Sequence, residues 1–164
     1  MQLPAHPLEY LRIENGDLFA DRPAQPRYRY LDTPEIKIIA KNQATQRAEA
    51  NLASYSFQLN GTTDPQWREL LKQELDNVPS GMNRKDLLVD PQGNVLVLTC
   101  SPVNLETKYQ FVKECIQRTN GKYANLRNSL IQKVIKMNEE QRKAEEMIKD
   151  ADKQIQKGFS DLKL

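Results

Sequence analysis

The sequence predicts an α+β protein, with a mostly antiparallel sheet that carries helices on one face and a long C-terminal helix of coiled-coil type. Three observations lead to this prediction. From residue 54 onward, the hydrophobic patterns follow the order strand, helix, strand, strand, helix. Two turn motifs, Asn15-Gly16 and Asp90-Pro91-Gln92-Gly93, separate apolar segments as in β-hairpins. After Lys122, apolar residues recur at seven-residue spacing in a segment without proline.

The N-terminal third predicts a hairpin, a strand and a helix. The segments EYLRI and DLF flank Asn15-Gly16, which is a strong signal for a tight hairpin turn. RYRYL, residues 27–31, alternates, so a strand would place Tyr28 and Tyr30 on one face. Thr33-Pro34-Glu35 has the residue types of a helix start, and apolar residues follow at helical spacing. We therefore expect a helix over residues 34–52.

The middle of the chain predicts three strands, two of them in a second hairpin, and two helices. SYSFQL, residues 54–59, alternates as a strand, and Asp64-Pro65 is a capping motif for a helix that carries Trp67 as a core residue. DLLV and NVLVLTC flank the turn at residues 90–93, and the unbroken apolar run VLVL predicts a central strand. A helix follows over residues 104–119, with Asn120-Gly121 as a candidate end. The sequence leaves open whether Gly121 breaks the helix or lies within one long helix.

The C-terminal segment predicts one helix with a seam of apolar residues along it. If continuous from residue 122, it would extend over about 60 Å. Such a seam is stable only against a partner: a helix of another protein, a second copy in antiparallel orientation, or the helix at 104–119 folded back. The seam residues expected to contact the partner are Leu130, Val134, Met137, Ile148, Ala151, Ile155 and Leu162. We therefore divide the chain into an N-terminal hairpin and strand segment (1–33), an α+β core domain (34–121) and the long helix (122–164).

Residues 115–138 contain five basic residues and no Asp or Glu, and the apolar seam does not account for this. On a helical wheel, Lys122, Lys133 and Lys136 share one polar face within about 40°. We interpret this face as the solvent-exposed side of the helix, because three lysines neutralise only about three phosphates, which is too few for strong binding of a nucleic acid. The alternative hypothesis is contact with phosphate or nucleic acid through Arg118, Lys122, Lys133 and Lys136.

Composition excludes several classes of chemistry. The net charge of +2 is too small to predict a nucleic-acid or membrane partner. His6 is the only histidine, which argues against Ser-His or Cys-His catalysis, and the two cysteines have no metal-binding spacing. The sequence contains no phosphate-binding loop or dinucleotide motif, so we expect no cofactor. It shows neither a signal peptide nor a membrane-spanning segment, so we expect a cytoplasmic protein.

Two sets of residues have the spacing of a metal-dependent nuclease, in which an Asp precedes Glu-x-Lys. These are Asp21 with residues 35–37 and Asp90 with residues 106–108. In such a nuclease site the Glu-x-Lys motif lies on a strand, whereas both Glu residues here fall in predicted helix starts. We therefore predict neither a metal site nor catalytic residues, and metal-dependent nuclease activity stays a third and weaker alternative.

The sequence leads to two hypotheses of function. The first is a non-catalytic interaction or assembly protein, which uses the C-terminal helix for self-association or for docking to a larger complex. The second is a nucleic-acid-binding accessory protein that uses the basic face of that helix. The sequence identifies neither the partner nor the oligomeric state.

Overall fold

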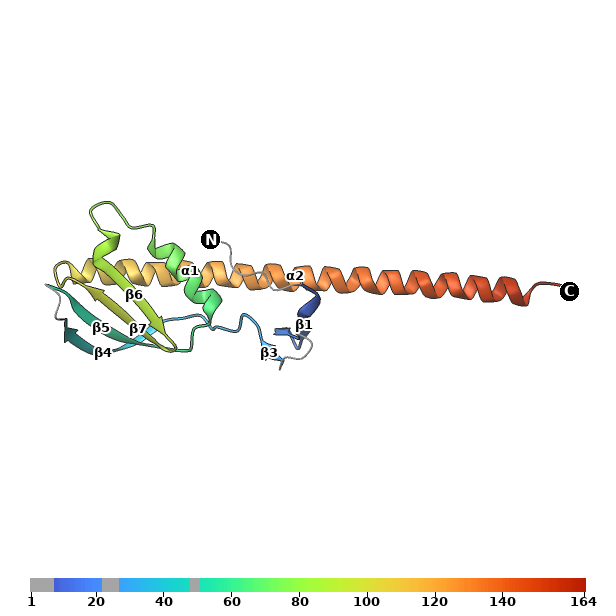
Figure 1. The fold of residues 1–164 in the computed structure, drawn as a ribbon, viewed down its shortest axis with the longest axis horizontal. Coiled ribbons are helices and arrows are strands. Elements are labelled where there is room, and N and C mark those ends of the chain that lie inside the picture. The colour runs from blue at the N-terminus through green and yellow to red at the C-terminus, as the bar shows by residue number, and fades with distance from the viewer. Residues whose placement is uncertain (1–7, 22–26, 48–50) are drawn as a thin grey trace. The chain divides into compact units, whose positions relative to one another are not determined.

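The computed structural model describes residues 8–21, 27–47 and 51–164, and it confirms the α+β class with two antiparallel sheets and a long C-terminal helix (Figure 1). The elements in chain order are η1 (Leu8–Tyr10), β1 (Leu11–Glu14), β2 (Asp17–Ala20), β3 (Tyr28–Arg29), β4 (Ile38–Gln46), β5 (Ala53–Leu59), α1 (Pro65–Leu75), η2 (Arg84–Asp86), β6 (Leu87–Gln92), β7 (Val95–Cys100) and α2 (Leu105–Ser160).

The chain forms two compact units. Within the first, residues 29–127 contain the four-stranded sheet, α1 and the N-terminal part of α2. The second combines the described residues of 8–28 with residues 128–164, and so it contains the N-terminal hairpin and the rest of α2.

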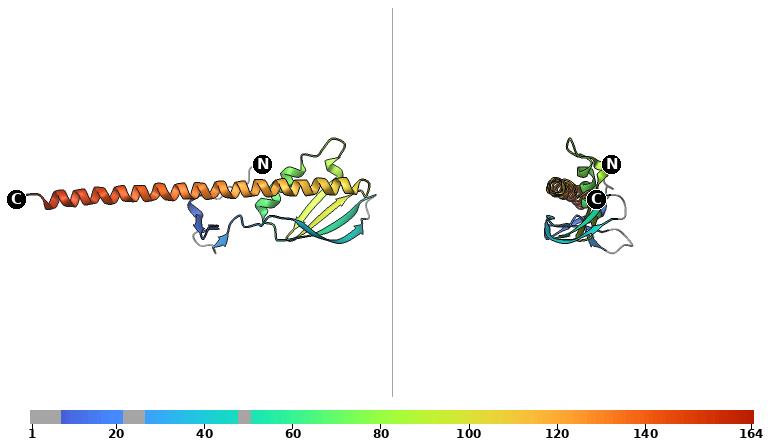
Figure 2. Two further views of the ribbon diagram at one scale, coloured as in Figure 1. Left: turned by 180° about the vertical axis from the view of Figure 1, so that it is seen from behind. Right: turned by 90° about the vertical axis from the view of Figure 1, so that its left-hand side faces the viewer.

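The sheet of the first unit has the strand order β4-β5-β7-β6, and every neighbouring pair is antiparallel. Both helices lie on the same face of this sheet (Figures 1 and 2). The predicted central strand is confirmed, because β7 lies between β5 and β6. Trp67 of α1 is fully buried, as expected of a core residue, together with Leu96 and Leu98 of β7 and Val112 of α2.

The predicted helix over residues 34–52 is wrong, because residues 38–46 form the edge strand β4 instead. Two asparagine side chains hold the preceding segment in an extended conformation. Asn60 accepts a hydrogen bond from the Lys37 amide at 2.7 Å and donates to the Glu35 carbonyl at 2.8 Å. Asn120 binds the amide and the carbonyl of Ile36 in the same way. These tertiary bonds use the backbone groups that a helix would need, and they override the local capping signal.

The capping motif before α1 is confirmed. Asp64 is the N-cap of the helix, and its Oδ1 accepts a hydrogen bond from the Trp67 amide at 2.8 Å. The second hairpin is also present, but its turn lies further along than predicted. Gln92 pairs with Val95, so the two-residue turn is Gly93-Asn94, and Pro91 belongs to β6. An edge strand tolerates this proline because one side of its backbone needs no partner within the sheet.

The helix α2 continues through Gly121, so the candidate end at Asn120-Gly121 is not a helix end and the question that the sequence left open is answered. A glycine inside a helix costs about 1 kcal/mol relative to alanine. Buried contacts on both sides offset this cost. Tyr123 is buried, and its hydroxyl accepts a hydrogen bond from the Thr33 amide at 3.0 Å and donates to Asp64 Oδ2. Tertiary packing therefore keeps the helix intact across the glycine.

In the second unit, the predicted N-terminal hairpin is confirmed as β1 and β2. Asn15 and Gly16 have φ values of 51° and 81°, the left-handed conformation that a tight hairpin turn requires. The strand predicted over residues 27–31 is shorter than expected, because β3 contains only Tyr28 and Arg29. Tyr28 is 48% exposed whereas Tyr30 is buried, so the two rings do not share a face as predicted.

Candidate functional site

The C-terminal part of α2 carries an exposed apolar stripe. Every residue from Asn138 to Leu164 is exposed. Between residues 138 and 160 the helix has seven apolar or glycine residues, and at about 100° per residue all seven fall within about 120° of the helix circumference. We call these residues the apolar stripe: Ala144, Met147, Ile148, Ala151, Ile155, Gly158 and Phe159.

The large side chains of the apolar stripe face solvent to an unusual degree. Met147 is 73% exposed, Ile148 69%, Ile155 66% and Phe159 77%. A helix with an apolar stripe wider than about 100° normally packs that stripe against a core. Within the described chain, these four side chains are left largely uncovered.

The predicted seam has two parts with different environments. Val134 is fully buried, and Leu130 and Met137 are half-buried. In the views of Figures 1 and 2, the hairpin of β1 and β2 lies beside this section of α2, within the same compact unit. The hairpin contributes buried Leu11 and Leu18 to that unit. The first part of the seam is therefore already occupied by the chain itself.

The second part of the seam is the exposed part. Ile148, Ala151 and Ile155 lie on α2 and are exposed, whereas Leu162 follows the end of the helix at Ser160. Sequence reasoning missed Met147 and Phe159, because the strict heptad register considers only two positions in seven. A helical wheel drawn at 3.6 residues per turn places both of them beside the seam, and this signal could have found them.

Two of the predicted phosphate-binding residues have an acidic partner in the first unit. Glu74 is almost completely buried and accepts a hydrogen bond from Arg118 Nε at 2.9 Å, while Lys122 forms a second ion pair with it. The hydrogen bond from Lys122 is the largest factor that holds the pKa of Glu74 below its usual value, and Arg118 acts in the same direction against the effect of burial. Their charges therefore compensate a buried carboxylate.

Lys133 and Lys136, the other two predicted basic contacts, are exposed on α2 in the second unit. The four cations are thus divided between the two units, and two of them already bind Glu74. Two exposed lysines alone contribute little to binding a polyanion.

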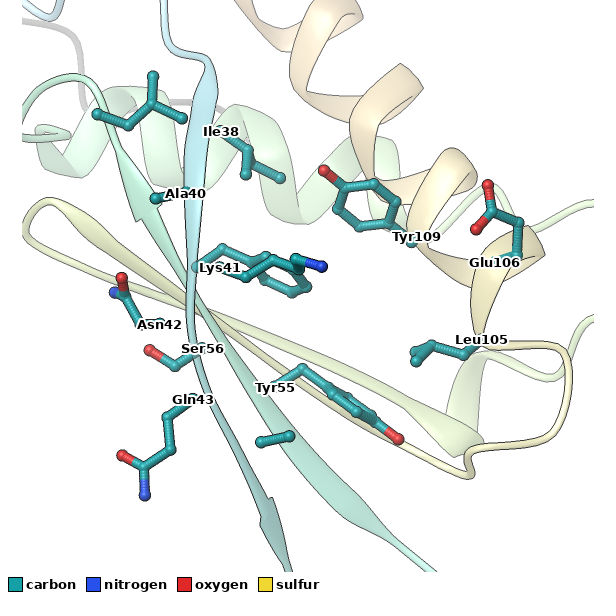
Figure 3. A pocket seen from close by; sticks show the side chains of 13 residues that line it. Ile38, Ala40, Lys41, Asn42, Gln43, Tyr55, Ser56, Leu105, Glu106 and Tyr109 are labelled. Atoms are coloured by element: carbon teal, nitrogen blue, oxygen red, sulfur yellow. The ribbon is translucent and has the colours of Figure 1, made fainter.

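The first unit also contains an open groove between the β4–β5 edge of the sheet and the start of α2 (Figure 3). Its volume is about 890 Å³. Ile38, Lys41 and Tyr55 line it from the sheet, and Tyr109 lines it from the helix. The Tyr109 ring stacks on Phe57 with a centroid distance of 5.2 Å. Sequence reasoning did not find this groove, because it expected residues 38–44 on a helix.

The groove contains no constellation for nucleophilic or acid–base catalysis. Its lining includes one carboxylate, Glu106, and one amine, Lys41, but neither histidine nor cysteine. Both cysteines, Cys100 and Cys115, are buried elsewhere, and burial raises the pKa of each thiol, which disfavours the reactive thiolate.

The described residues contain no group of three or more His, Cys, Asp or Glu side chains that could hold a metal ion. In the second carboxylate motif, Asp90 accepts a hydrogen bond from Gln92 at 2.6 Å, and Glu106 accepts one from Gln110 at 3.3 Å. Among the helices that the structure describes, none is both long and apolar enough to cross a membrane.

Comparison with protein families, with curated proteins and with solved structures finds no match to this chain.

Proposed function

We propose that this chain is a non-catalytic interaction or assembly protein, in which the C-terminal part of α2 docks onto a helical surface of a second copy or of another protein. The observation that carries this proposal is the apolar stripe, which collects every apolar residue of the last helical section on one exposed side. The proposal places the contact at Met147, Ile148, Ala151, Ile155 and Phe159.

The energetics support a partner that has apolar surface of its own. Burial of a large apolar side chain contributes about 1.5–3 kcal/mol. Met147, Ile148, Ile155 and Phe159 are about two-thirds to three-quarters exposed, so each would contribute about 1–2 kcal/mol. The sum of about 4–8 kcal/mol is comparable with the cost of association, about 4–15 kcal/mol. Polar surfaces offer no such gain, and so an apolar partner helix fits best.

Site-specific photo-crosslinking of the full chain tests this proposal. A photoreactive amino acid replaces Ile148 in the stripe or, as the matched control, Lys153 on the opposite side of α2. We expect one discrete adduct from position 148, either a dimer of the purified chain or a complex in cell extract, and none from position 153. The adduct should disappear when Ile155→Asp is added. Equal labelling from both positions, or no adduct together with a monomeric mass in light scattering, would contradict the proposal.

The nucleic-acid hypothesis remains the alternative, although the ion pairs of Arg118 and Lys122 with Glu74 weaken its basis. It requires affinity for single- or double-stranded DNA or RNA that decreases steeply with salt. Replacement of Lys133 and Lys136 by Glu should then reduce this affinity. Unchanged affinity would remove these residues from consideration.

A further inference from the structure

We infer that the partner of the apolar stripe is a helix of a different protein, with Lys or Arg beside its own apolar seam, rather than a second copy of this chain. This inference rests on the proposed function and specifies the chemistry of its partner. It follows from the charges that border the stripe.

In this section of α2, every charged residue at the heptad positions beside the seam is acidic. In a pair of packed helices, the two positions beside the seam in each heptad face the partner and determine which helix it accepts. In the helical section from 138 to 160, these positions include Glu140, Glu145 and Asp152 but neither Lys nor Arg. The basic residues of this section occupy the other heptad positions: Arg142, Lys143, Lys149, Lys153 and Lys157. Lys143 lies about 40° from Met147 on the helical wheel, and the other four lie further from the stripe.

One basic side chain on the back of the helix interacts with an acid there. Arg142 Nη1 donates to Glu146 Oε1 at 2.6 Å, one turn away on the same side. Acids therefore occur on both sides of this section of α2, whereas the heptad positions beside the seam carry acids and no bases. Such a distribution attracts a basic surface to the stripe.

Pairing with a second copy would place acids opposite acids. In a parallel pair, Glu140 would face Glu145 of the second copy. In an antiparallel pair that sets Ile148 against Ala151, Glu145 would face Asp152 of the second copy. Because no flanking position of this section carries a base, no alignment of two copies creates an opposite-charge pair there. Repulsion between these like charges disfavours a second copy relative to a partner that carries bases at the same positions.

The sizes of the stripe residues further specify the partner. The small residues Ala144, Ala151 and Gly158 alternate with Ile148 and Ile155 along the stripe. Close packing at protein-interior density requires a large aliphatic side chain opposite each small one. We therefore expect Leu, Ile or Met at the seam of the partner helix, with Lys or Arg beside them.

An anionic membrane surface fits the stripe less well than a protein does. Helices that lie on such membranes carry Lys and Arg beside the apolar face, where the lipid head groups attract them. Here Glu145 and Asp152 occupy that place, and anionic lipids would repel them.

Two designed helical peptides, each about four heptads long, provide the test. Both have the same Leu and Ile seam, and they differ only in carrying Lys or Glu at every flanking position. Binding of the labelled peptides to the full chain is measured by fluorescence anisotropy at low and high salt. We expect the Lys peptide to bind at least about tenfold more tightly at low salt, and we expect this preference to shrink as salt screens the charges.

Charge-reversed variants of the full chain show which side of the helix is responsible. The variant Glu145→Lys with Asp152→Lys should reverse the preference toward the Glu peptide. The control variant Lys149→Glu with Lys153→Glu changes as many charges on the same helix but away from the stripe, and it should retain the original preference. A control that shifts the preference as much as the first variant would show that net charge, not the stripe border, determines binding, and it would overturn the inference.

The variant Ile148→Asp with Ile155→Asp separates failure of this inference from failure of the proposed function. If both peptides bind the wild-type chain equally and this variant binds neither, the stripe is a docking site and only the charge inference is wrong. If the wild-type chain is a stable dimer that excludes both peptides, the second copy is the partner and the inference is again overturned. If the chain is monomeric and binds neither peptide, the inference and the proposed function are both wrong.

Discussion

Replacement of Asn120 by alanine should destabilise the first unit, because this one side chain joins three parts of it. Its Oδ1 accepts hydrogen bonds from the Ile36 amide at 3.1 Å and from Trp67 Nε1 at 3.0 Å. Its Nδ2 donates to the Ile36 carbonyl at 2.9 Å. Trp67 and Ile36 are completely or almost completely buried. The substitution therefore removes the partner of two buried donors and one buried acceptor.

The expected loss of stability is about 3 kcal/mol. A buried polar group without a partner costs about 1–3 kcal/mol. The two groups of Ile36 adjoin an open groove of about 270 Å³ that Asn120 also lines, so water can replace part of their bonding and we assign them about 1 kcal/mol together. The Trp67 indole is fully buried, so its N–H accounts for about 2 kcal/mol.

Urea unfolding followed by tryptophan fluorescence measures this loss directly, because Trp67 is the only tryptophan. With a slope of about 2 kcal/mol per molar urea, the midpoint should decrease by about 1.5 M. Gln117→Ala, an exposed change one turn earlier on α2, is the matched control and should shift the midpoint by less than about 0.3 M. A shift below about 0.5 M for Asn120→Ala would refute the assigned role of these hydrogen bonds.

Three further predictions concern the first unit. Glu74→Gln should cost about 1 kcal/mol at pH 7, because both cationic partners of the carboxylate are about half exposed. The pKa of Glu74 is lowered in the folded state, so its stabilisation is complete above the usual pKa of a glutamate and decreases as the pH falls through the folded-state pKa. Chemical unfolding of both proteins at pH 7 and pH 3 should show a smaller difference at pH 3, and a constant difference would contradict this. Tyr123→Phe should cost about 1–2 kcal/mol through the loss of two hydrogen bonds. The pKa of the Tyr123 phenol is raised, mainly by burial, so its contribution to folding stability is complete below about pH 10 and declines above it. In unfolding experiments at alkaline pH, the difference in stability between Tyr123→Phe and the wild-type chain should therefore decrease. Gly61→Ala should reduce the thermal midpoint of unfolding, because the added Cβ would lie 2.7 Å from Pro34 Cγ. Gly121→Ala places its Cβ in open space on a helix and should increase the midpoint. Equal shifts of the two midpoints would exclude the steric explanation.

The sequence predicted correctly those elements whose start or turn depends on neighbouring residues. Asn15-Gly16 forms a hairpin turn because its left-handed backbone needs no distant partner. Asp64 caps α1 through a bond to an amide three residues away. The α+β class follows from these local signals and from the order of the periodic segments.

The sequence could not predict the elements that depend on distant residues. Residues 38–46 carry a local helix signal, but they pair with β5, and the segment before them binds Asn60 and Asn120. The groove beside Tyr109 was missed for the same reason, because it requires β4 to be a strand. Likewise, Gly121 would end a helix in isolation, whereas buried packing on both sides carries α2 across it.

The sequence by itself determined that the C-terminal helix has an apolar side, because the seven-residue spacing of its seam follows from the order of residues alone. Only the tertiary structure decided which part of this side is available to a partner. Val134 is buried in the same compact unit as the N-terminal hairpin, whereas Ile148 and Ile155 remain exposed. Periodicity records that a residue is apolar, but burial depends on segments more than a hundred residues away in the chain, and no local pattern contains that information.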